Sequence, residues 1–215
     1  ANLDNPLGHG NGRSTPRGPG YHDPSTLNED ERRIATELST ALATTTYEIR
    51  DKLSEVMPGL FLSNGQIAQD LALLRAQRIS HVLNMAPIEV PTTAEFYAEE
   101  KMDFKAIVAK DEFDYDVMQH WPEARAYLDA ALNEQNGRVL IHCQAGINRS
   151  GAIAVAYMMV TRRRLLVDAA KSAKRKRYQL ITNLNFQLSL VKFASAEGLL
   201  GKPALPRRMS SPNPY

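Results

Sequence analysis

Cysteine is nearly absent from this chain of 215 residues, which has a single one, Cys143. One thiol excludes an intramolecular disulfide and a zinc site built from several cysteines. No apolar run approaches the roughly 18 residues that a membrane-spanning helix needs. The first 20 residues are polar and rich in glycine and proline, unlike a signal peptide. We therefore expect a protein of the cytoplasm or also of the nucleus, with no membrane partner.

An excess of charge of one sign is also lacking. The chain carries 26 Lys and Arg against 24 Asp and Glu, a formal net charge of +2. Because this excess is too small for a dedicated polyanion binder, nucleic acid is not expected as a partner. The hydrophobic fraction of 43% and the charged fraction of 23% are typical of a globular protein. The length suits one substantial domain, and nothing in the sequence indicates an oligomeric state.

The two ends of the chain contain few aliphatic residues. Residues 1–27 are dominated by Gly, Pro, Asn, Ser and Arg, and residues 199–215 carry four prolines. We predict a flexible N-terminal arm and a flexible C-terminal tail, because such segments bury too little surface to order themselves. Residues 28–55 are predicted as a helical extension beginning at Asn28 or Asp30, and residues 56–198 as the main domain.

Strands and helices are predicted to alternate within this domain. Periodicity indicates strands near residues 60–62, 79–85, 104–109 and 138–142, and helices over 66–76, 117–132, 151–161, 165–178 and 183–194. This order predicts an α/β fold with a central, mostly parallel sheet of four to five strands, flanked by helices on both faces. Ligands of such sheets bind beyond the carboxyl ends of the strands, which directs attention to the loop after residue 142.

That loop carries the only cysteine. The segment from His142 to Gly151 joins a buried strand to a helix and includes Gly146. Inward-facing backbone amides and the start of the following helix would form a site for a dianionic phosphate. The same field favours the thiolate over the thiol, so Cys143 is predicted to be a nucleophile.

Other residues of the loop have predicted roles around the phosphate. Arg149 carries a planar guanidinium that holds two phosphate oxygens at once, which lysine does less well. The hydroxyl of Ser150 is placed to stabilise the departing thiolate. His142 is expected to support the loop rather than to act as a base. The phosphate-binding residues are predicted to be Gln144, Ala145, Gly146, Ile147, Asn148 and Arg149.

The pattern His-Cys, five residues, Arg-Ser, set between a hydrophobic strand and a helix, resembles the signature loop of the protein tyrosine phosphatase superfamily. Residues 136–143 and 156–159 resemble the small atypical dual-specificity phosphatases in particular, and the likeness runs from about residue 56 to residue 194. The resemblance implies a protein tyrosine phosphatase-like fold and a phosphocysteine intermediate, without cofactor or metal. It implies phosphorylated proteins as substrates, at tyrosine as well as at serine and threonine.

Cleavage of a phosphate ester also needs a proton for the leaving oxygen, which a carboxylic acid on a nearby loop supplies. Four acidic residues follow the apolar segment 104–109: Asp111, Glu112, Asp114 and Asp116. The resemblance places the general acid on Asp111. Asp114 remains the alternative, because the register within this acidic cluster is ambiguous.

Two departures from the family pattern leave alternatives open. Asn148 stands where many members have serine, which brings the loop closer to RNA 5′-triphosphatase relatives, and Thr182 stands where proline is common. One alternative is the same chemistry on an RNA 5′-end, a phosphoinositide or a phosphoglucan. Another is a phosphoprotein-binding module that has lost turnover. The basic stretch 171–177 is interpreted as a solvated helix face.

Overall fold

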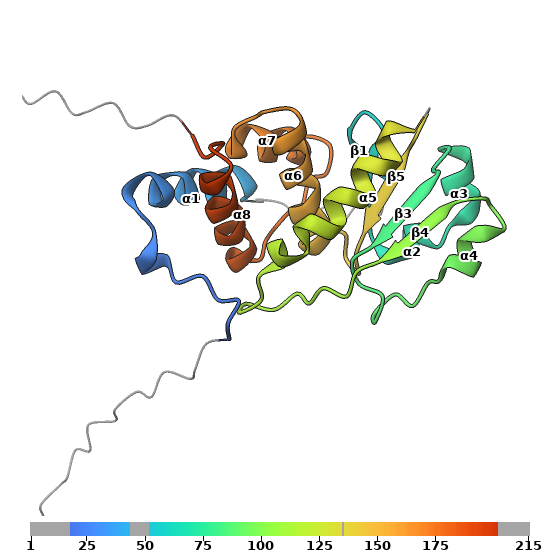
Figure 1. The fold of residues 1–215 in the computed structure, drawn as a ribbon, viewed down its shortest axis with the longest axis horizontal. Helices are drawn as coiled ribbons and strands as arrows, with labels where there is room; N and C mark the ends of the chain where they lie inside the picture. The colour runs from blue at the N-terminus through green and yellow to red at the C-terminus, as the bar shows by residue number, and fades with distance from the viewer. Residues whose placement is uncertain (1–17, 44–51, 135, 202–215) are drawn as a thin grey trace, which may run out of the picture.

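The computed structural model describes residues 18–43, 52–134 and 136–201. It confirms the predicted α/β fold, with one mostly parallel five-stranded sheet between helices (Figure 1). The strands lie in the order β1-β2-β5-β3-β4. Their bounds are Ser54–Met57 for β1, Leu60–Ser63 for β2, His81–Asn84 for β3, Asp103–Ala106 for β4 and Val139–His142 for β5.

The helices follow the predicted order along the chain. Short 3-10 turns occupy Pro24–Thr26 (η1) and Val117–His120 (η2). The α-helices are α1 (Glu29–Leu42), α2 (Gly65–Ala68), α3 (Leu71–Ala76), α4 (Ala94–Ala98), α5 (Trp121–Asn133), α6 (Arg149–Thr161), α7 (Leu166–Lys174) and α8 (Leu184–Ala196).

Parallel pairing brings four strand ends to one edge of the sheet. β5 lies between β2 and β3, and β4 pairs with β3. His142 is in register with Ser63 on one side and Asn84 on the other, and Asn84 is in register with Ala106. The loop after β5 therefore begins at the centre of this edge, between the loops that follow its neighbours.

Alternate residues of the strands face two different layers, as the period of two in a β-strand requires. Leu62, Leu83 and Ile141 belong to the larger core, which contains residues of α1 and of α5 to α8. Phe61 and Leu140 belong to a smaller cluster with residues of α2 to α4. Both faces of the sheet are thus covered, which explains why β2, β3 and β5 are buried along their whole length.

Three elements differ from the sequence-based expectations: β1, the helix predicted over residues 66–76, and α4, for which no helix was predicted. β1 was not expected; it pairs antiparallel with β2 at the edge of the sheet, through a turn that places Gly59 at φ +81°. The single helix predicted over residues 66–76 is divided, because Asp70 interrupts it and caps the second part by accepting a hydrogen bond from Leu73 N at 2.9 Å. Such local capping competes with helix continuation, and periodicity alone does not detect it.

The predicted helix before the sheet is present and is part of the main core. It begins with a capping box in which Asn28 and Glu31 exchange hydrogen bonds, and it buries Ile34, Leu38 and Leu42. Together with β1, which starts at Ser54, this makes the segment 28–55 continuous with the fold where it is described. Residues 1–17 and 202–215, where the flexible ends were predicted, lie outside the described residues.

Residues 18–27 belong to the predicted arm but pack onto the fold. Leu27 is buried, and the amide of Asn185 in α8 accepts from His22 N at 2.8 Å and donates to Gly20 O at 2.9 Å. The same amide donates to Tyr115 O at 3.0 Å, so this segment is tied to the loop after β4. Side chain-to-backbone hydrogen bonds thus hold residues 18–27 against the fold, although this stretch has almost no aliphatic residues.

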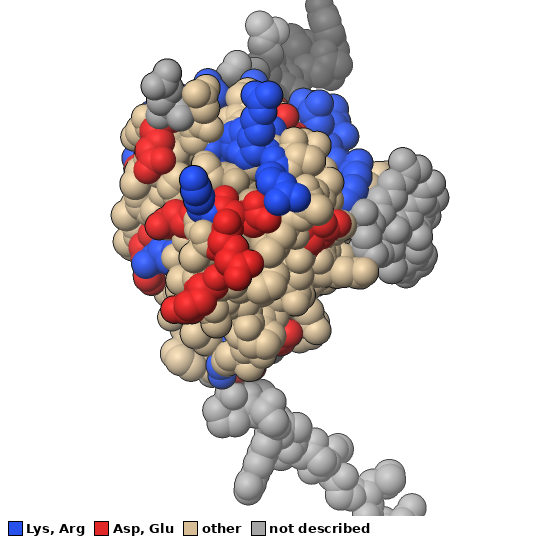
Figure 2. Space-filling model, turned by 90° about the vertical axis from the view of Figure 1, so that its right-hand side faces the viewer, with Lys and Arg blue, Asp and Glu red and all other residues tan. Residues whose placement is uncertain are grey.

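Surface charge on the face beyond α3 and α4 is mixed. Figure 2 shows acidic side chains across the middle of this face and basic side chains above them. Ion pairs join Arg75 to Glu100 at 2.8 Å and Lys105 to Glu123 at 2.8 Å. This face therefore has no uniform potential for a polyanion. Within the described ranges, no helix combines the length and the hydropathy required to span a bilayer.

Candidate active site

Cys143 follows β5 directly and is 1% exposed. Its Sγ accepts a hydrogen bond from Gly146 N at 3.2 Å and lies 3.3 Å from Ser150 Oγ. An amide and a hydroxyl thus converge on the sulfur, and both are able to donate to a thiolate. This contact places Ser150 where the sequence predicted it, beside the sulfur of Cys143.

The loop from Gln144 to Asn148 has all five of its carbonyl oxygens occupied by protein donors. Gln144 O accepts from Gly65 N, Ile147 O from Ile181 N and Asn148 O from Ala152 N, at 3.0, 3.0 and 2.8 Å. The carbonyls of residues 145 and 146 accept from Arg177. Because N–H and C=O of a trans peptide point in opposite directions, outward carbonyls leave the amides facing the inside of the loop. The result is an anion-binding nest.

Glycine at position 146 is a structural requirement of this loop. Its φ is +68°, and a Cβ there would lie 2.3 Å from the carbonyl oxygen of Ser63. A side chain would therefore be strained by the backbone conformation and would also overlap β2. The close approach lets the loop pack against the end of the neighbouring strand.

Arg177 is the residue that the sequence-based interpretation got wrong. It lies in the basic stretch predicted as a solvated face, but it is 6% exposed. Its Nε donates to Gly146 O at 2.5 Å and its Nη2 to Ala145 O at 3.3 Å, while Nη1 donates to Lys52 O at 3.1 Å. The guanidinium therefore fixes two loop peptides and links them to the segment before β1. Composition does not distinguish this arginine from its exposed neighbours; only its place after α7 does.

Arg149, the first residue of α6, is 2% exposed. Its Nη1 donates to Glu89 Oε1 at 2.7 Å and to Ala109 O at 3.0 Å. Its Nε is buried and has no hydrogen-bond partner among the described residues. Buried donors are nearly always satisfied, so an unpartnered one beside a phosphate nest indicates a place for an acceptor ligand. Sequence reasoning missed Glu89, which reaches the arginine from the loop after β3.

Asp111 is held against the loop by two side-chain amides. Asn148 Nδ2 donates to both carboxylate oxygens, at 3.2 and 3.0 Å, and Asn183 Nδ2 donates to Oδ1 at 3.0 Å. Asp114 instead accepts from Gly18 N at 3.2 Å. The structure thus brings Asp111, and not Asp114, into contact with the loop that contains Cys143.

His142 is buried at the end of β5, and its Nδ1 lies 3.4 Å from Cys143 O. Burial lowers the pKa of His142 to about 4, and the backbone contact opposes this only in part. The ring is therefore neutral near pH 7, and the contact requires its proton on Nδ1. A neutral, buried ring fits the predicted supporting role better than a role as a base.

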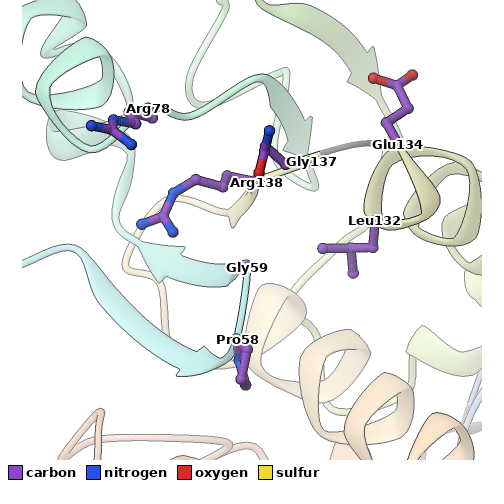
Figure 3. A pocket seen from close by; sticks show the side chains of 8 residues that line it. Pro58, Gly59, Arg78, Leu132, Glu134, Gly137 and Arg138 are labelled. Atoms are coloured by element: carbon purple, nitrogen blue, oxygen red, sulfur yellow. The ribbon is translucent and has the colours of Figure 1, made fainter.

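A separate cavity of about 540 Å³ lies at the opposite edge of the sheet, by the β1–β2 turn and the start of β5. Figure 3 shows the turn residues Pro58 and Gly59 on one side of it and Arg138 on another. It includes none of the predicted site residues. Its lining is Pro58, Gly59, Arg78, Leu132, Glu134, Asn136, Gly137 and Arg138.

A cysteine at the end of a central parallel strand, an amide nest and a buried arginine together define the site of a cysteine-based phosphatase fold. The comparisons agree with this class. The family model "Dual specificity phosphatase, catalytic domain" matches residues 60–196, and the chain belongs to this family.

Curated relatives carry the same family name. The chain is 34% identical over 137 residues to dual specificity protein phosphatase 26 of Bos taurus. The aligned region covers 64% of this chain and 64% of the relative. It is 35% identical over 127 residues to dual specificity protein phosphatase 13B of Mus musculus, covering 58% of this chain and 64% of the relative. The chain thus spans just under two thirds of the length of these relatives.

Solved structures share the fold. Human DUSP28 superimposes with a TM-score of 0.60 at 22% identity, covering 73% of this chain and 99% of that structure. The human tyrosine phosphatase-like serine/threonine/tyrosine-interacting protein gives a TM-score of 0.61 at 26% identity, covering 69% of this chain and 99% of the other.

Proposed function

We propose that this protein is a dual-specificity protein phosphatase that hydrolyses phosphotyrosine and phosphoserine or phosphothreonine in proteins. The observation that carries the proposal is the loop from Gln144 to Asn148, whose five carbonyls are all bound from outside. Its amides are thereby preorganised for a phosphoryl group above the sulfur of Cys143. Preorganised donors of this kind are a large source of transition-state stabilisation.

The proposed reaction has two steps. The thiolate of Cys143 attacks phosphorus, the bond from phosphorus to the substrate oxygen breaks, and Asp111 gives its proton to that oxygen. In the second step the ionised Asp111 takes a proton from water, which attacks the phosphocysteine and releases inorganic phosphate. Ser150 donates to the departing sulfur, and Arg149 holds the phosphoryl oxygens throughout.

The choice of Asp111 as the acid is supported by its position. It is the carboxylate that contacts the nucleophile loop, through Asn148, whereas Asp114 is bonded to the N-terminal segment. A backbone contact reinforces this, because Arg149 donates to Ala109 O two residues before Asp111.

A protein substrate is supported by the surroundings of the site. Large apolar side chains are exposed on three segments that touch it: Ile88 beside Glu89, Phe113 near Asp111, and Leu184 beside Asn183. An apolar rim suits peptide side chains better than a sugar or a polyphosphate, and no residue from 144 to 148 is charged. We place these substrates among signalling phosphoproteins of the cytoplasm or nucleus.

One observation favours a second candidate function, a phosphoprotein-binding module without turnover. The human structural neighbour at 26% identity is named as an interacting protein that is phosphatase-like. A module of that kind would bind phosphoproteins without cleaving them. This chain, however, retains Cys143, Arg149 and Asp111 in one site, which favours turnover.

The test is hydrolysis of p-nitrophenyl phosphate and of phosphotyrosine and phosphothreonine peptides, with EDTA present throughout. We expect the wild type to turn over, Cys143→Ser to be inactive, and Asp111→Asn to lose about 100-fold or more in kcat, the usual contribution of a general acid. Asp114→Asn is the matched control and should stay within a few-fold of wild type. Peptide binding without cleavage by the wild type would establish the binding module instead.

A further inference from the structure

Asn148 is an unusual residue for the start of α6, because its side chain does not cap the helix. Asparagine at this position normally accepts a hydrogen bond from an amide in the first helical turn. Here no side-chain capping bond forms, and the backbone of Asn148 is in the helical region, at φ −93° and ψ −69°. The carboxamide is turned away from its own helix and serves another purpose.

Both ends of that carboxamide are engaged outside the loop. Its Nδ2 donates to the carboxylate of Asp111 at 3.2 and 3.0 Å. Its Oδ1 accepts from Thr182 N at 2.7 Å, from Thr182 Oγ1 at 3.2 Å and from Asn183 N at 3.1 Å. One side chain therefore bridges the acid loop after β4 and the turn before α8.

The partner turn completes the contact from the other side. Asn183 caps α8 with its Oδ1, while its Nδ2 donates to Asp111 Oδ1 and to Glu112 O at 3.0 and 3.1 Å. The carboxylate of Asp111 is thus held between two amides, each fixed by a second set of hydrogen bonds. An acid held this way is restricted in position before substrate arrives.

The same network links the two departures from the family pattern. Serine at position 148 could not span both partners, because its hydroxyl is shorter than a carboxamide. Proline at position 182 would have no N–H to give to Asn148 Oδ1, which is the shortest bond of the set at 2.7 Å. Asparagine at 148 and a residue with a backbone N–H at 182 therefore support each other.

We propose that Asn148 is a positioning residue that holds Asp111 and the acid loop in place against the turn Thr182–Asn183. This proposal rests on the proposed function, because Asn148 acts through Asp111. The side chain of Asn148 does not touch the phosphoryl group. Its loss should impair protonation of the leaving oxygen and leave phosphate binding nearly unchanged.

The test compares substrates that differ in their need for an acid. Phenyl phosphate has a poor leaving group and p-nitrophenyl phosphate a good one, so general-acid catalysis matters more for the former. We expect Asn148→Leu to lower kcat/KM, which reports formation of the phosphoenzyme and therefore protonation of the leaving oxygen, about 50-fold for phenyl phosphate but less than about 5-fold for p-nitrophenyl phosphate. The inhibition constant for tungstate, a phosphate analogue, should stay within about twofold of wild type. Asn133→Leu, the same substitution at an exposed position at the end of α5, is the matched control and should change kcat/KM by no more than about twofold.

Two further measurements separate positioning from general damage. In an Asp111→Asn background, Asn148→Leu should cause no further loss, since its effect passes through the carboxylate. Amide hydrogen exchange over residues 107–116 should be faster in Asn148→Leu than in wild type. An equal loss on both substrates, an additive loss in the Asp111→Asn background, or unchanged exchange would each overturn the proposal. A wild type that cleaves neither substrate would refute the proposed function, and the positioning role with it.

Discussion

Arg177→Met tests whether the phosphate loop depends on a buried brace. The guanidinium donates to Gly146 O and Ala145 O and reaches across to Lys52 O. Methionine fills a similar volume but gives no donor, so the two loop carbonyls lose their partners in a buried place. At about 1.5 kcal/mol for each of these three hydrogen bonds from a charged donor, the free energy of unfolding should fall by about 4 to 5 kcal/mol.

The activity should fall as well, because peptides released from Arg177 are free to turn their carbonyls inward. Removing one preorganised donor from a catalytic site costs about 100-fold or more in kcat, and we expect a loss of about 100-fold in kcat/KM for an aryl phosphate. Tungstate, a phosphate analogue, should bind more weakly to the folded variant. Arg177→Lys should be intermediate, since an ammonium keeps the charge but not the planar fork.

Arg175→Met is the matched control, because it removes the same functional group from an exposed position two residues away. Urea unfolding followed by the fluorescence of the only tryptophan, Trp121, gives the stability of each variant. An Arg177→Met protein with the stability and kcat/KM of Arg175→Met would refute the bracing role.

Three other perturbations test different parts of the structure. Gly146→Ala should abolish most activity, because the φ of Gly146 is +68° and the added Cβ would lie 2.3 Å from Ser63 O. Gly198→Ala is the control. Gly198 has a similar φ of +67°, but its added Cβ would meet no atom within 4 Å, so kcat/KM should be unchanged. Leu38 is fully buried in α1, so Leu38→Ala should lower the free energy of unfolding by about 2 to 5 kcal/mol. Leu184 is exposed, so Leu184→Ala should lower it by less than about 0.5 kcal/mol. Equal effects of the two substitutions would show that α1 is not part of the core. The pKa of His142 is lowered to about 4 in the folded state, so the unfolded chain binds its proton first as pH falls, and stability is lost from about pH 6.5 to 4. The loss from this one group is about 3 kcal/mol by linkage. Unfolding measured at both pH values should show it in wild type and not in His142→Gln, and the same pH slope in both proteins would contradict the assignment.

Elements whose signals are local could be predicted from the amino-acid sequence. The alternation of buried strands and amphipathic helices specified the α/β class, and Asn28, one of the two predicted start positions, is the N-cap of α1. Cys143, Arg149 and Ser150 were predictable because the loop places all three within eight residues of chain. Spacing along a strand, a short loop and a helix keeps such neighbours close together, although the exact shape of the loop depends on donors from elsewhere in the chain.

The packing of the layers determines which distant residues complete the site. Glu89 was not predicted, and the choice between Asp111 and Asp114 was left open by the sequence. Glu89 and Asp111 reach the loop because β3 and β4 end at the same edge as β5, and periodicity does not give this order of strands. Asn148 could be predicted as a loop residue, but its bridge to Asp111 depends on where α8 begins. Arg177 is one of several basic residues after α7, and it is buried because the chain turns there beneath the loop. Contacts between residues far apart in sequence depend on how the layers pack, and the sequence pattern of either partner alone carries no record of them.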